Sequence, residues 1–228
     1  MSAAEVIAID GPAASGKSTL AKKLAEHLHY LFFDTGVMYR AVTLMALRNG
    51  IEIEHESAIT ALAERIQIDV QPPSKSDGRL NDVLVDDADV TWEIRQPDVE
   101  ANVSIVSAYA GVRQAMTGQQ RRIGSRNRVV MVGRDIGTVV MPEAGLKIYL
   151  DATVEERARR RYHECLVRGD IVEFSEIFES MQERDRIDST RQIAPLRPAD
   201  DAIVIQSDKL DADQVLQKVL GLIDGANP

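Results

Sequence analysis

Short apolar runs alternate with longer amphipathic segments along most of the chain. The short runs predict buried strands at 6–9, 31–33, 128–133, 146–151 and 202–205. Apolar residues spaced three and four apart predict helices at 20–28, 37–48, 57–64, 97–107, 110–124, 174–186 and 211–222. Thr153, with Glu156 three residues later, has the spacing of a capping box and predicts one more helix start. The alternation of strands and helices predicts an α/β fold with a parallel sheet.

Between residues 66 and 91 the hydrophobic pattern changes to a period of two. Residues 66–70 and 79–85 alternate, and the Pro, Ser and Gly residues at 72–79 predict a turn between them. Residues 89–91 complete a small antiparallel meander, with Thr91 as a candidate cap for a helical segment at 92–95. We interpret Trp92 as a packing residue. Such an insertion is a place where a second substrate can be recognised.

Composition and charge narrow the class of protein. The 228 residues suit one α/β domain with an inserted lobe, or two small domains. A net charge of −9 argues against a surface that coats nucleic acid, although a local arginine cluster can still bind a small anion. The one cysteine, Cys165, excludes an intrachain disulfide and is interpreted as packing. With no signal-peptide pattern and no apolar run long enough to cross a bilayer, we expect a cytoplasmic protein without a membrane partner.

One stretch fits the phosphate-binding pattern G-x-x-x-x-G-K-[ST] without a mismatch. It lies between a predicted strand and a predicted helix, which is the context that the motif requires. Backbone N–H groups of such a loop surround a phosphate, and the helix dipole adds positive potential. Lys17 can reach the outer phosphates, and the Ser18 hydroxyl can ligate a magnesium ion. The residues of the loop are Gly11, Pro12, Ala13, Ala14, Ser15, Gly16, Lys17, Ser18 and Thr19.

Charged residues also follow other predicted strands. Asp34 ends the second strand, where it can hold water around a magnesium ion or cap the next helix, and the sequence leaves both open. Arg40, one turn later, can hold an anion, although taken alone it is more typical of a solvated surface residue. Arg134 and Asp135 follow a strand directly, at the sheet edge where open α/β folds bind ligands. A dense arginine run then follows at 157–168, and we interpret it as a phosphate-facing lid rather than a solvated face.

These features together predict phosphoryl transfer between two anions. That chemistry needs positive charge around the transferring group and exclusion of water, and it needs no covalent nucleophile. The four histidines show no catalytic or zinc-binding spacing.

Four motifs make the chain resemble the bacterial cytidylate kinases, which belong to the nucleoside monophosphate kinase family of P-loop NTPases. They are DGPAASGKST at 10–19, DTGVMYR at 34–40, GRDIGTVVMP at 133–142 and RDRIDSTR at 184–191. The first is shared by many P-loop enzymes, whereas the third and fourth in that order are close to diagnostic. The resemblance runs from the first strand to the last helix.

The resemblance implies a three-layer P-loop fold with a central parallel sheet, an inserted antiparallel substrate-binding lobe and a helical lid. The core would comprise 1–62 and 125–228, with the lid at about 153–172 and the nucleoside-monophosphate-binding region at 63–124. The implied reaction is ATP-dependent phosphorylation of CMP or dCMP to the diphosphate, with Mg²⁺. The partners are then these small molecules, and family analogy favours a monomer.

The resemblance also implies roles for individual residues. Lys17, Arg134 and Arg191 match catalytic positions. Ser18 matches the magnesium ligand, and Arg157 matches the lid over ATP bound by residues 11–19. Arg40, Arg134 and Arg191 match the clamp on the acceptor phosphate, and Arg184 and Asp188 match ribose contacts. Ser104, Arg113 and Asp135 match the cytosine-reading residues, and Thr35 and Tyr39 match residues that line the acceptor site.

The chemistry of cytosine agrees with such a base site. An aspartate can accept from the N4 amino group while an arginine donates to N3 and O2. Uracil reverses two of these groups, and mismatched buried polar groups discriminate by roughly 10⁴-fold.

Two positions depart from the family pattern. Gly111 stands near a position where proline is usual, and we expect it to loosen the turn that leads to Arg113. Gln206 stands where aspartate is common. The alternatives are another P-loop kinase acting on UMP, a different nucleoside monophosphate or shikimate, and a non-enzymatic nucleotide-binding module. The Asn-Lys-x-Asp guanine reader typical of GTP switches is absent from the sequence.

Overall fold

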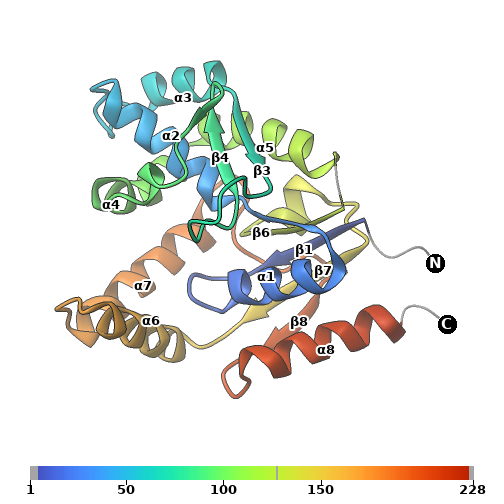
Figure 1. The fold of residues 1–228 in the computed structure, drawn as a ribbon. Helices are drawn as coiled ribbons and strands as arrows, with labels where there is room; N and C mark the ends of the chain where they lie inside the picture. The colour runs from blue at the N-terminus through green and yellow to red at the C-terminus, as the bar shows by residue number, and fades with distance from the viewer. Residues whose placement is uncertain (1–4, 127, 226–228) are drawn as a thin grey trace.

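The centre of the protein is a five-stranded parallel sheet with the strand order β2-β6-β1-β7-β8 (Figure 1). The computed structural model describes residues 5–126 and 128–225. The strand order reverses at β1, which pairs with β6 on one side and β7 on the other. A ligand crevice forms at the carboxyl ends of the strands at such a reversal. The strands are β1 Val6–Asp10, β2 Leu31–Asp34, β6 Val129–Gly133, β7 Leu146–Asp151 and β8 Ile203–Gln206.

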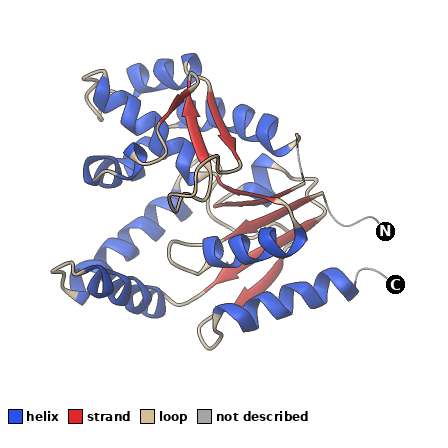
Figure 2. Ribbon diagram, viewed as in Figure 1, coloured by secondary structure: helices blue, strands red, loops and turns tan. Residues whose placement is uncertain are grey.

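Helices cover both faces of this sheet, as the coloured ribbon shows (Figure 2). Ile7 and Ile9 of β1 belong to the apolar cluster formed with α1 and α8, whereas Ala8 between them belongs to the cluster formed with α2 and α5. This alternation is the period of two of a strand that is buried on both faces. The helices are α1 Lys17–Leu28, α2 Gly36–Arg48, α3 Glu56–Arg65, α4 Pro97–Val106, α5 Ala110–Gly124, α6 Val154–Arg168, α7 Phe174–Thr190 and α8 Ala212–Gly225. The prediction of a three-layer α/β fold is confirmed.

The predicted meander forms a separate antiparallel sheet in the order β3-β4-β5. These strands are β3 Ile68–Gln71, β4 Asp82–Val85 and β5 Ala88–Asp89. The buried Arg79 side chain forms ion pairs with Asp77 of its own loop, Asp82 of β4 and Asp89 of β5, and so ties the loop to these two strands. α3 crosses the boundary predicted at residue 62. The division into a core (1–62 and 125–228) and an inserted region (63–124) stays a prediction. Residues 1–4, 127 and 226–228 of these ranges lie outside the described part.

Two expectations for the segment after the meander are wrong. Thr91 does not cap the short helix η1 (Glu93–Arg95), because its Oγ1 accepts a hydrogen bond from the backbone N–H of Val83 at 2.9 Å. Trp92 is 46% exposed rather than packed in the core. Its Nε1 donates to Asp77 Oδ2 at 3.0 Å, and the Arg95 guanidinium stands over the ring.

α6 and α7 form a helical pair that projects from the sheet (Figure 1). Thr153 caps α6 by accepting from the Glu156 N–H at 3.3 Å, so the predicted helix start is confirmed. α7 continues to Thr190, one turn beyond the predicted end at 186. This extra turn places Arg184 and Asp188 on the same helix face, because residues four apart align. No helix in the described ranges has both the length and the apolar character needed to cross a membrane.

Candidate active site

The loop after β1 has the backbone shape that the glycine motif predicts. Gly11 and Gly16 have positive φ angles of 146° and 96°. A Cβ atom on Gly11 would lie 2.1 Å from the carbonyl oxygen of Leu150, so no larger residue fits without displacing β7. Gly16 stands directly before α1, whose first N–H groups open toward the loop.

Lys17 is buried inside this loop. Its Nζ donates to the carbonyl oxygen of Pro12 and, at 3.3 Å, to the hydroxyl of Ser15. Burial lowers the pKa of Lys17 well below its ordinary value, and the nearby positive charge of Arg134 lowers it further. Two cations held close together in a partly dehydrated site favour the binding of an anion between them.

Ser18 and Asp34 bring two hard oxygen donors together. The Ser18 hydroxyl donates to Asp34 Oδ2 at 3.0 Å, and Asp34 Oδ1 accepts the N–H of Gly36 at 3.0 Å. One oxygen of Asp34 therefore caps α2 and the other faces the P-loop hydroxyl, so the two interpretations left open by the sequence are compatible. In the described ranges no group of three or more His, Cys, Asp or Glu residues is arranged to hold a metal ion.

Two arginines of α6 contact the P-loop directly. Arg157 Nη1 donates to the carbonyl oxygen of Ala13 at 3.2 Å, and Arg160 Nη1 donates to that of Ser15 at 3.4 Å. The other arginines of the run form surface ion pairs with acidic neighbours: Arg159 with Glu155, Arg161 with Glu164, and Arg168 with Asp170. The expectation of a wholly phosphate-facing run is thus wrong for these three, which lie on a solvated face.

Asp188 lies between two of the predicted clamp arginines. Its Oδ2 accepts from Arg134 Nε at 2.9 Å, and its Oδ1 accepts from Arg191 Nη1 at 3.1 Å. Burial alone would raise the pKa of Asp188, but the charge and hydrogen bond of Arg134, followed by the charge of Arg191, hold it below its ordinary value. Motifs that are 50 or more residues apart in the chain therefore converge on one carboxylate.

Arg113 and Asp135 form a second buried pair. Arg113 Nη2 donates to Asp135 Oδ2 at 2.6 Å, and only 4% and 7% of the two side chains are exposed. The Arg113 guanidinium also lies over the Tyr39 ring, 5.4 Å from its centroid. Nε of Arg113 and Nη2 of Arg191 are buried without a hydrogen-bond partner. Unpaired buried donors of this kind are expected where a polar ligand completes the network.

The remaining predicted residues lie around these pairs with less specific contacts. Arg40 forms an ion pair with Glu100 of α4. Burial and then the charge of Arg134 lower the pKa of Arg184. Thr35 Oγ1 donates to the carbonyl oxygen of Val132 at 2.8 Å and so joins the start of α2 to β6.

Ser104, the third predicted base-reading residue, forms no hydrogen bond with Arg113 or Asp135. Its carbonyl oxygen accepts from Ser107 Oγ at 3.0 Å, and it is the carbonyl oxygen of Ser107, not Ser104, that accepts from Arg113 Nη1 at 3.1 Å.

The expectation that Gly111 loosens the turn before Arg113 is also wrong. α5 begins at Ala110, and a Cβ atom on Gly111 would lie 2.2 Å from Cγ2 of Thr60 on α3. Gly111 therefore permits close packing of two helices.

Three residues of the site, Ser207, Asp185 and Asp10, were not singled out from the sequence, and Arg160 was predicted only as a member of the arginine run at 157–168. Arg160 and Ser207 donate to the carbonyl oxygen of Ser15, and Asp185 accepts from Arg157 Nη1 at 3.1 Å. Asp10 accepts two backbone N–H groups from the turn that follows β6. A signal was available only for Asp10, because an acidic residue that ends an apolar strand directly before a P-loop is unusual for a buried position.

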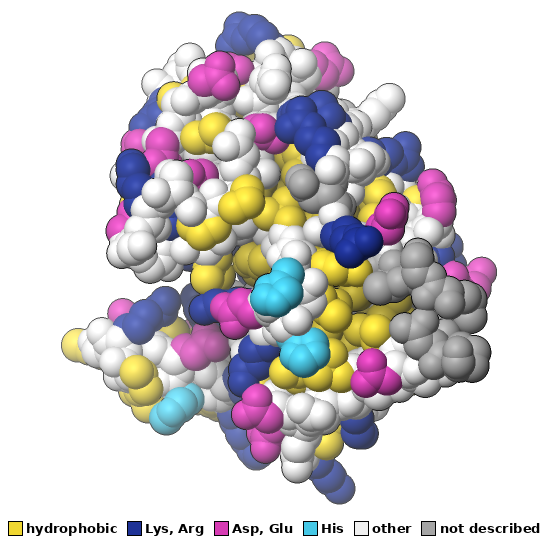
Figure 3. Space-filling view, turned by 45° about the vertical axis from the view of Figure 1, so that its right-hand side comes forward, with side chains coloured by type: hydrophobic (Ala, Val, Ile, Leu, Met, Phe, Trp, Pro, Cys, Tyr) yellow, Lys and Arg dark blue, Asp and Glu magenta, His cyan; other side chains and the backbone are white. Residues whose placement is uncertain are grey.

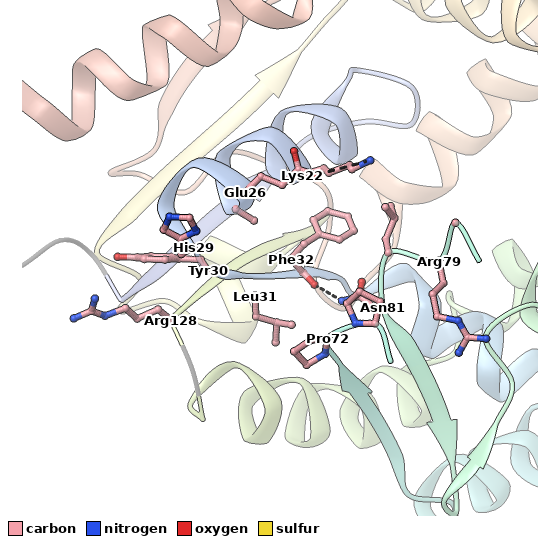
Figure 4. Close-up of a pocket in the computed structure, with 14 residues that line it drawn as sticks. Lys22, Glu26, His29, Tyr30, Leu31, Phe32, Pro72, Arg79, Asn81 and Arg128 are labelled. Carbon is pink, nitrogen blue, oxygen red and sulfur yellow. Dashed lines mark hydrogen bonds and ion pairs between the residues drawn. The ribbon is translucent and has the colours of Figure 1, made fainter. Parts of the chain in front are cut away.

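The surface is hollowed next to the projecting helices. The space-filling view shows a notch between the α6–α7 pair and the rest of the protein, with basic and acidic side chains gathered at its inner end (Figure 3). A separate cavity of about 790 Å³ lies between α1, β2 and the 72–81 loop (Figure 4). There Asn81 Nδ2 donates to the carbonyl oxygen of Phe32 at 2.8 Å. None of the predicted site residues lines this second cavity.

Comparison with known proteins gives a consistent result across the chain. The family model described as cytidylate kinase matches residues 7–225. The cytidylate kinase of Roseiflexus castenholzii is 54% identical over 224 residues, covering 98% of this chain and 95% of that protein. The cytidylate kinase of Herpetosiphon aurantiacus is 47% identical over 223 residues, covering 98% of this chain and 96% of that protein.

A solved structure extends the comparison to the fold alone. The crystal structure of an uncharacterized protein from Eubacterium ventriosum aligns with a TM-score of 0.50 at 13% identity, covering 96% of this chain and 98% of that one. The family match, by contrast, spans all the strands and helices that build the site, including the motifs at 133–142 and 184–191. This chain belongs to the cytidylate kinase family.

Proposed function

We propose that the protein transfers the γ-phosphoryl group of ATP to CMP and dCMP, giving ADP with CDP or dCDP. Membership of the cytidylate kinase family implies the reaction and ATP as the phosphate donor. The structural observation that carries the proposal furthest is the buried Arg113–Asp135 pair beside the Arg134–Asp188–Arg191 group, because it joins a base-reading pair to a phosphate clamp.

The donor site consists of the P-loop and the two α6 arginines that contact it. Residues 11–19 surround the ATP phosphates with backbone N–H groups, and Lys17 binds the transferring group. The contacts of Arg157 and Arg160 with loop carbonyls support a lid function for the segment 153–172. Because burial and Arg134 lower the pKa of Lys17, bound phosphate restores a favourable environment for its charge.

Magnesium fits the oxygen donors at the mouth of the loop. The Ser18 hydroxyl would bind the ion directly and Asp34 would act through water, which suits a cation that keeps several waters and takes phosphate oxygens as ligands. When bound, the ion neutralises charge that develops on the β- and γ-phosphates.

The acceptor phosphate binds to Arg40, Arg134 and Arg191. Its oxygen attacks the γ-phosphorus as the bond to the bridging oxygen of ADP breaks, and the guanidinium groups stabilise the negative charge on the transferring oxygens. Arg184 and Asp188 bind the ribose in this proposal. Asp188 also holds two of the clamp arginines, so binding of the acceptor would rearrange or share these hydrogen bonds.

The cytosine base binds next to Arg113 and Asp135. The unpartnered Nε of Arg113 is a donor available for N3 or O2, and Asp135 accepts from N4. Tyr39 and Thr35 line the site, and Ser104 on α4 completes it. The region 63–124 then serves as the nucleoside-monophosphate-binding part, beside a core formed by the remaining residues.

A panel of acceptors tests this proposal. ADP release from ATP and Mg²⁺ is measured with CMP, dCMP, UMP, AMP, GMP, dTMP and shikimate. We expect CMP and dCMP to be used far faster than the other acceptors. Equal rates across the panel would contradict the base assignment, and activity with shikimate alone would favour a different P-loop kinase. ATP binding without transfer to any acceptor would favour a nucleotide-binding module.

The same proposal describes a cytoplasmic monomer that acts on small molecules. Family analogy favours a monomer. Sedimentation of the protein with and without ATP and CMP tests the oligomeric state, for which we expect the mass of one chain.

A further inference from the structure

Asp10 joins the donor loop to the turn that carries the acceptor residues. It ends β1, one residue before Gly11, and only 5% of the residue is exposed. Its Oδ1 accepts the N–H of Ile136 at 2.8 Å and its Oδ2 accepts the N–H of Gly137 at 2.7 Å. Both carboxylate oxygens are thus bound to consecutive backbone amides more than 120 residues further along the chain.

These two hydrogen bonds fix the orientation of the turn. Ile136 and Gly137 open the single wide turn η2 (Ile136–Val140), and their N–H groups belong to the first two peptide units after Asp135. The turn has little room to shift, because a Cβ atom on Gly137 would lie 3.2 Å from the Lys147 side chain and 3.4 Å from Asp10 Oδ2. The Asp10 carboxylate therefore fixes the position of the Asp135 backbone and, with it, that of the adjacent Arg134.

Arg134 and Asp135 each belong to a different half of the acceptor site. Arg134 donates to Asp188, and Asp135 accepts from Arg113. Asp10 itself continues into the loop proposed to hold ATP. One side chain thus sets the position of the acceptor residues relative to the donor loop, and phosphoryl transfer depends strongly on that relative position.

We propose that Asp10 is a positioning residue for phosphoryl transfer, which holds the Arg134–Asp135 turn in register with the P-loop through the amides of Ile136 and Gly137. This inference rests on the proposed function. It assigns Asp10 no contact with substrate, and its effect passes through Arg134 and Asp135.

The test is the Asp10→Asn variant, which keeps the shape of the side chain but turns one acceptor oxygen into a donor that faces an N–H group. We expect kcat/KM for CMP to fall about 100-fold, with a higher KM for CMP and a smaller preference for CMP over UMP. The KM for ATP should change by no more than about twofold. A merely structural role would not change the kinetic constants for CMP while leaving the KM for ATP unchanged.

Asp211→Asn is the control for removing a carboxylate charge that is bound to backbone amides. A single oxygen of the exposed Asp211, Oδ1, accepts the backbone N–H groups of Asp213 and Gln214 at 2.9 and 2.8 Å at the start of α8, so the variant loses the charge but can keep both hydrogen bonds. We expect its kinetic constants to match those of the wild type. If Asp10→Asn does not fold, Asp10→Ser and Asp211→Ser give the same comparison.

The outcomes separate the two proposals. A wild type that releases no ADP with CMP overturns the proposed function and this inference with it. A wild type active on CMP together with an Asp10→Asn variant of unchanged kinetics overturns the inference alone. A variant that loses affinity for ATP and keeps its CMP parameters also overturns it, since Asp10 would then act on the P-loop.

Discussion

The guanidinium of Arg134 and the carboxylate of Asp188 form an ion pair at 2.9 Å, although 54 residues separate them in the chain. The same carboxylate accepts from Arg191 at 3.1 Å. Without Asp188 two guanidinium groups would face each other in a partly buried site. The pair therefore joins the turn after β6 to the end of α7 and keeps both arginines available to an incoming phosphate.

The Asp188→Asn variant tests this arrangement. Loss of the charge leaves Arg134 and Arg191 without their shared counter-ion, so we expect kcat/KM for CMP to fall about 100-fold. The free energy of unfolding should fall by about 2–4 kcal/mol, because a buried ion pair is broken on one side only. Steady-state assays with varied CMP and urea unfolding measure the two effects. Asp201→Asn is the control, since Asp201 pairs with Lys147 but is 68% exposed, and its kinetics should not change. CMP kinetics within twofold of the wild type would refute the role of Asp188.

The Asp135→Asn variant tests base recognition. Asp135 Oδ2 is held by Arg113 at 2.6 Å, and an amide at this position offers uracil O4 a donor that a carboxylate lacks. We expect the ratio of kcat/KM for CMP over UMP to narrow by roughly 100-fold, within the range by which mismatched polar groups discriminate. The measurement is a competition assay with both acceptors at fixed ATP. An unchanged ratio would show that Asp135 does not read the base.

The features predicted correctly from the sequence are those with local signals. The strands around β1 follow from apolar runs, and the P-loop follows from glycines with positive φ angles, of which Gly11 also lies too close to Leu150 for any side chain to fit. The start of α6 follows from Thr153 and Glu156, which are three residues apart. Each of these depends on a few neighbouring residues, so a single sequence contains the information.

The contacts that complete the site depend on positions far apart in the chain. Nothing near Asp10 indicates that its partners are the amides of Ile136 and Gly137, because only the pairing of β1 with β6 brings them together. The surface position of Trp92 likewise depends on the Asp77 loop that it meets. Arg113 and Asp135 are expected from the resemblance to read one base together, but the ion pair that they form with each other requires tertiary geometry.

Close packing between α3 and α5 gives a prediction about stability. A Cβ atom on Gly111 would lie 2.2 Å from Thr60 Cγ2 and 2.7 Å from its Oγ1, so Gly111→Ala should lower the free energy of unfolding by about 1–3 kcal/mol. Adding Thr60→Ala removes both atoms and should restore most of the loss. Gly118→Ala is the control in the same helix, because its Cβ atom meets nothing within 4 Å, and it should stabilise by about 0.5–1 kcal/mol. Urea unfolding of the four proteins decides the matter, and equal midpoints for the two single alanine variants would contradict the packing argument.

The buried charge of Asp10 gives a prediction about pH. Burial raises the pKa of Asp10 from 3.8 to about 6, although the amides of Gly137 and Ile136 offset part of that effect. Three titratable groups face Asp10. The charge of Asp135 raises the pKa of Asp10, and the charge of Lys17 lowers the pKa of Asp10. The third group is Tyr149 of β7.

The sign follows from proton counting. Between about pH 4 and pH 6 the native state binds more protons at Asp10 than the unfolded chain, so the contribution of Asp10 to the free energy of unfolding falls as the pH rises and is constant above that window. The total change is about 3 kcal/mol. Asp10→Asn has no such titration, so the stability of the wild type relative to the variant should fall by about that amount between pH 4 and pH 7.

Catalytic activity of the wild type should rise over the same pH range, since protonation of Asp10 turns one acceptor oxygen into a donor and weakens the hold on the Arg134–Asp135 turn. Urea unfolding and CMP assays on both proteins across this range test the two trends together, and parallel stability curves would show that Asp10 does not titrate there. Ionisation of Asp10 at neutral pH thus lowers stability, and in the proposed role the same charge is needed to hold the acceptor residues in place.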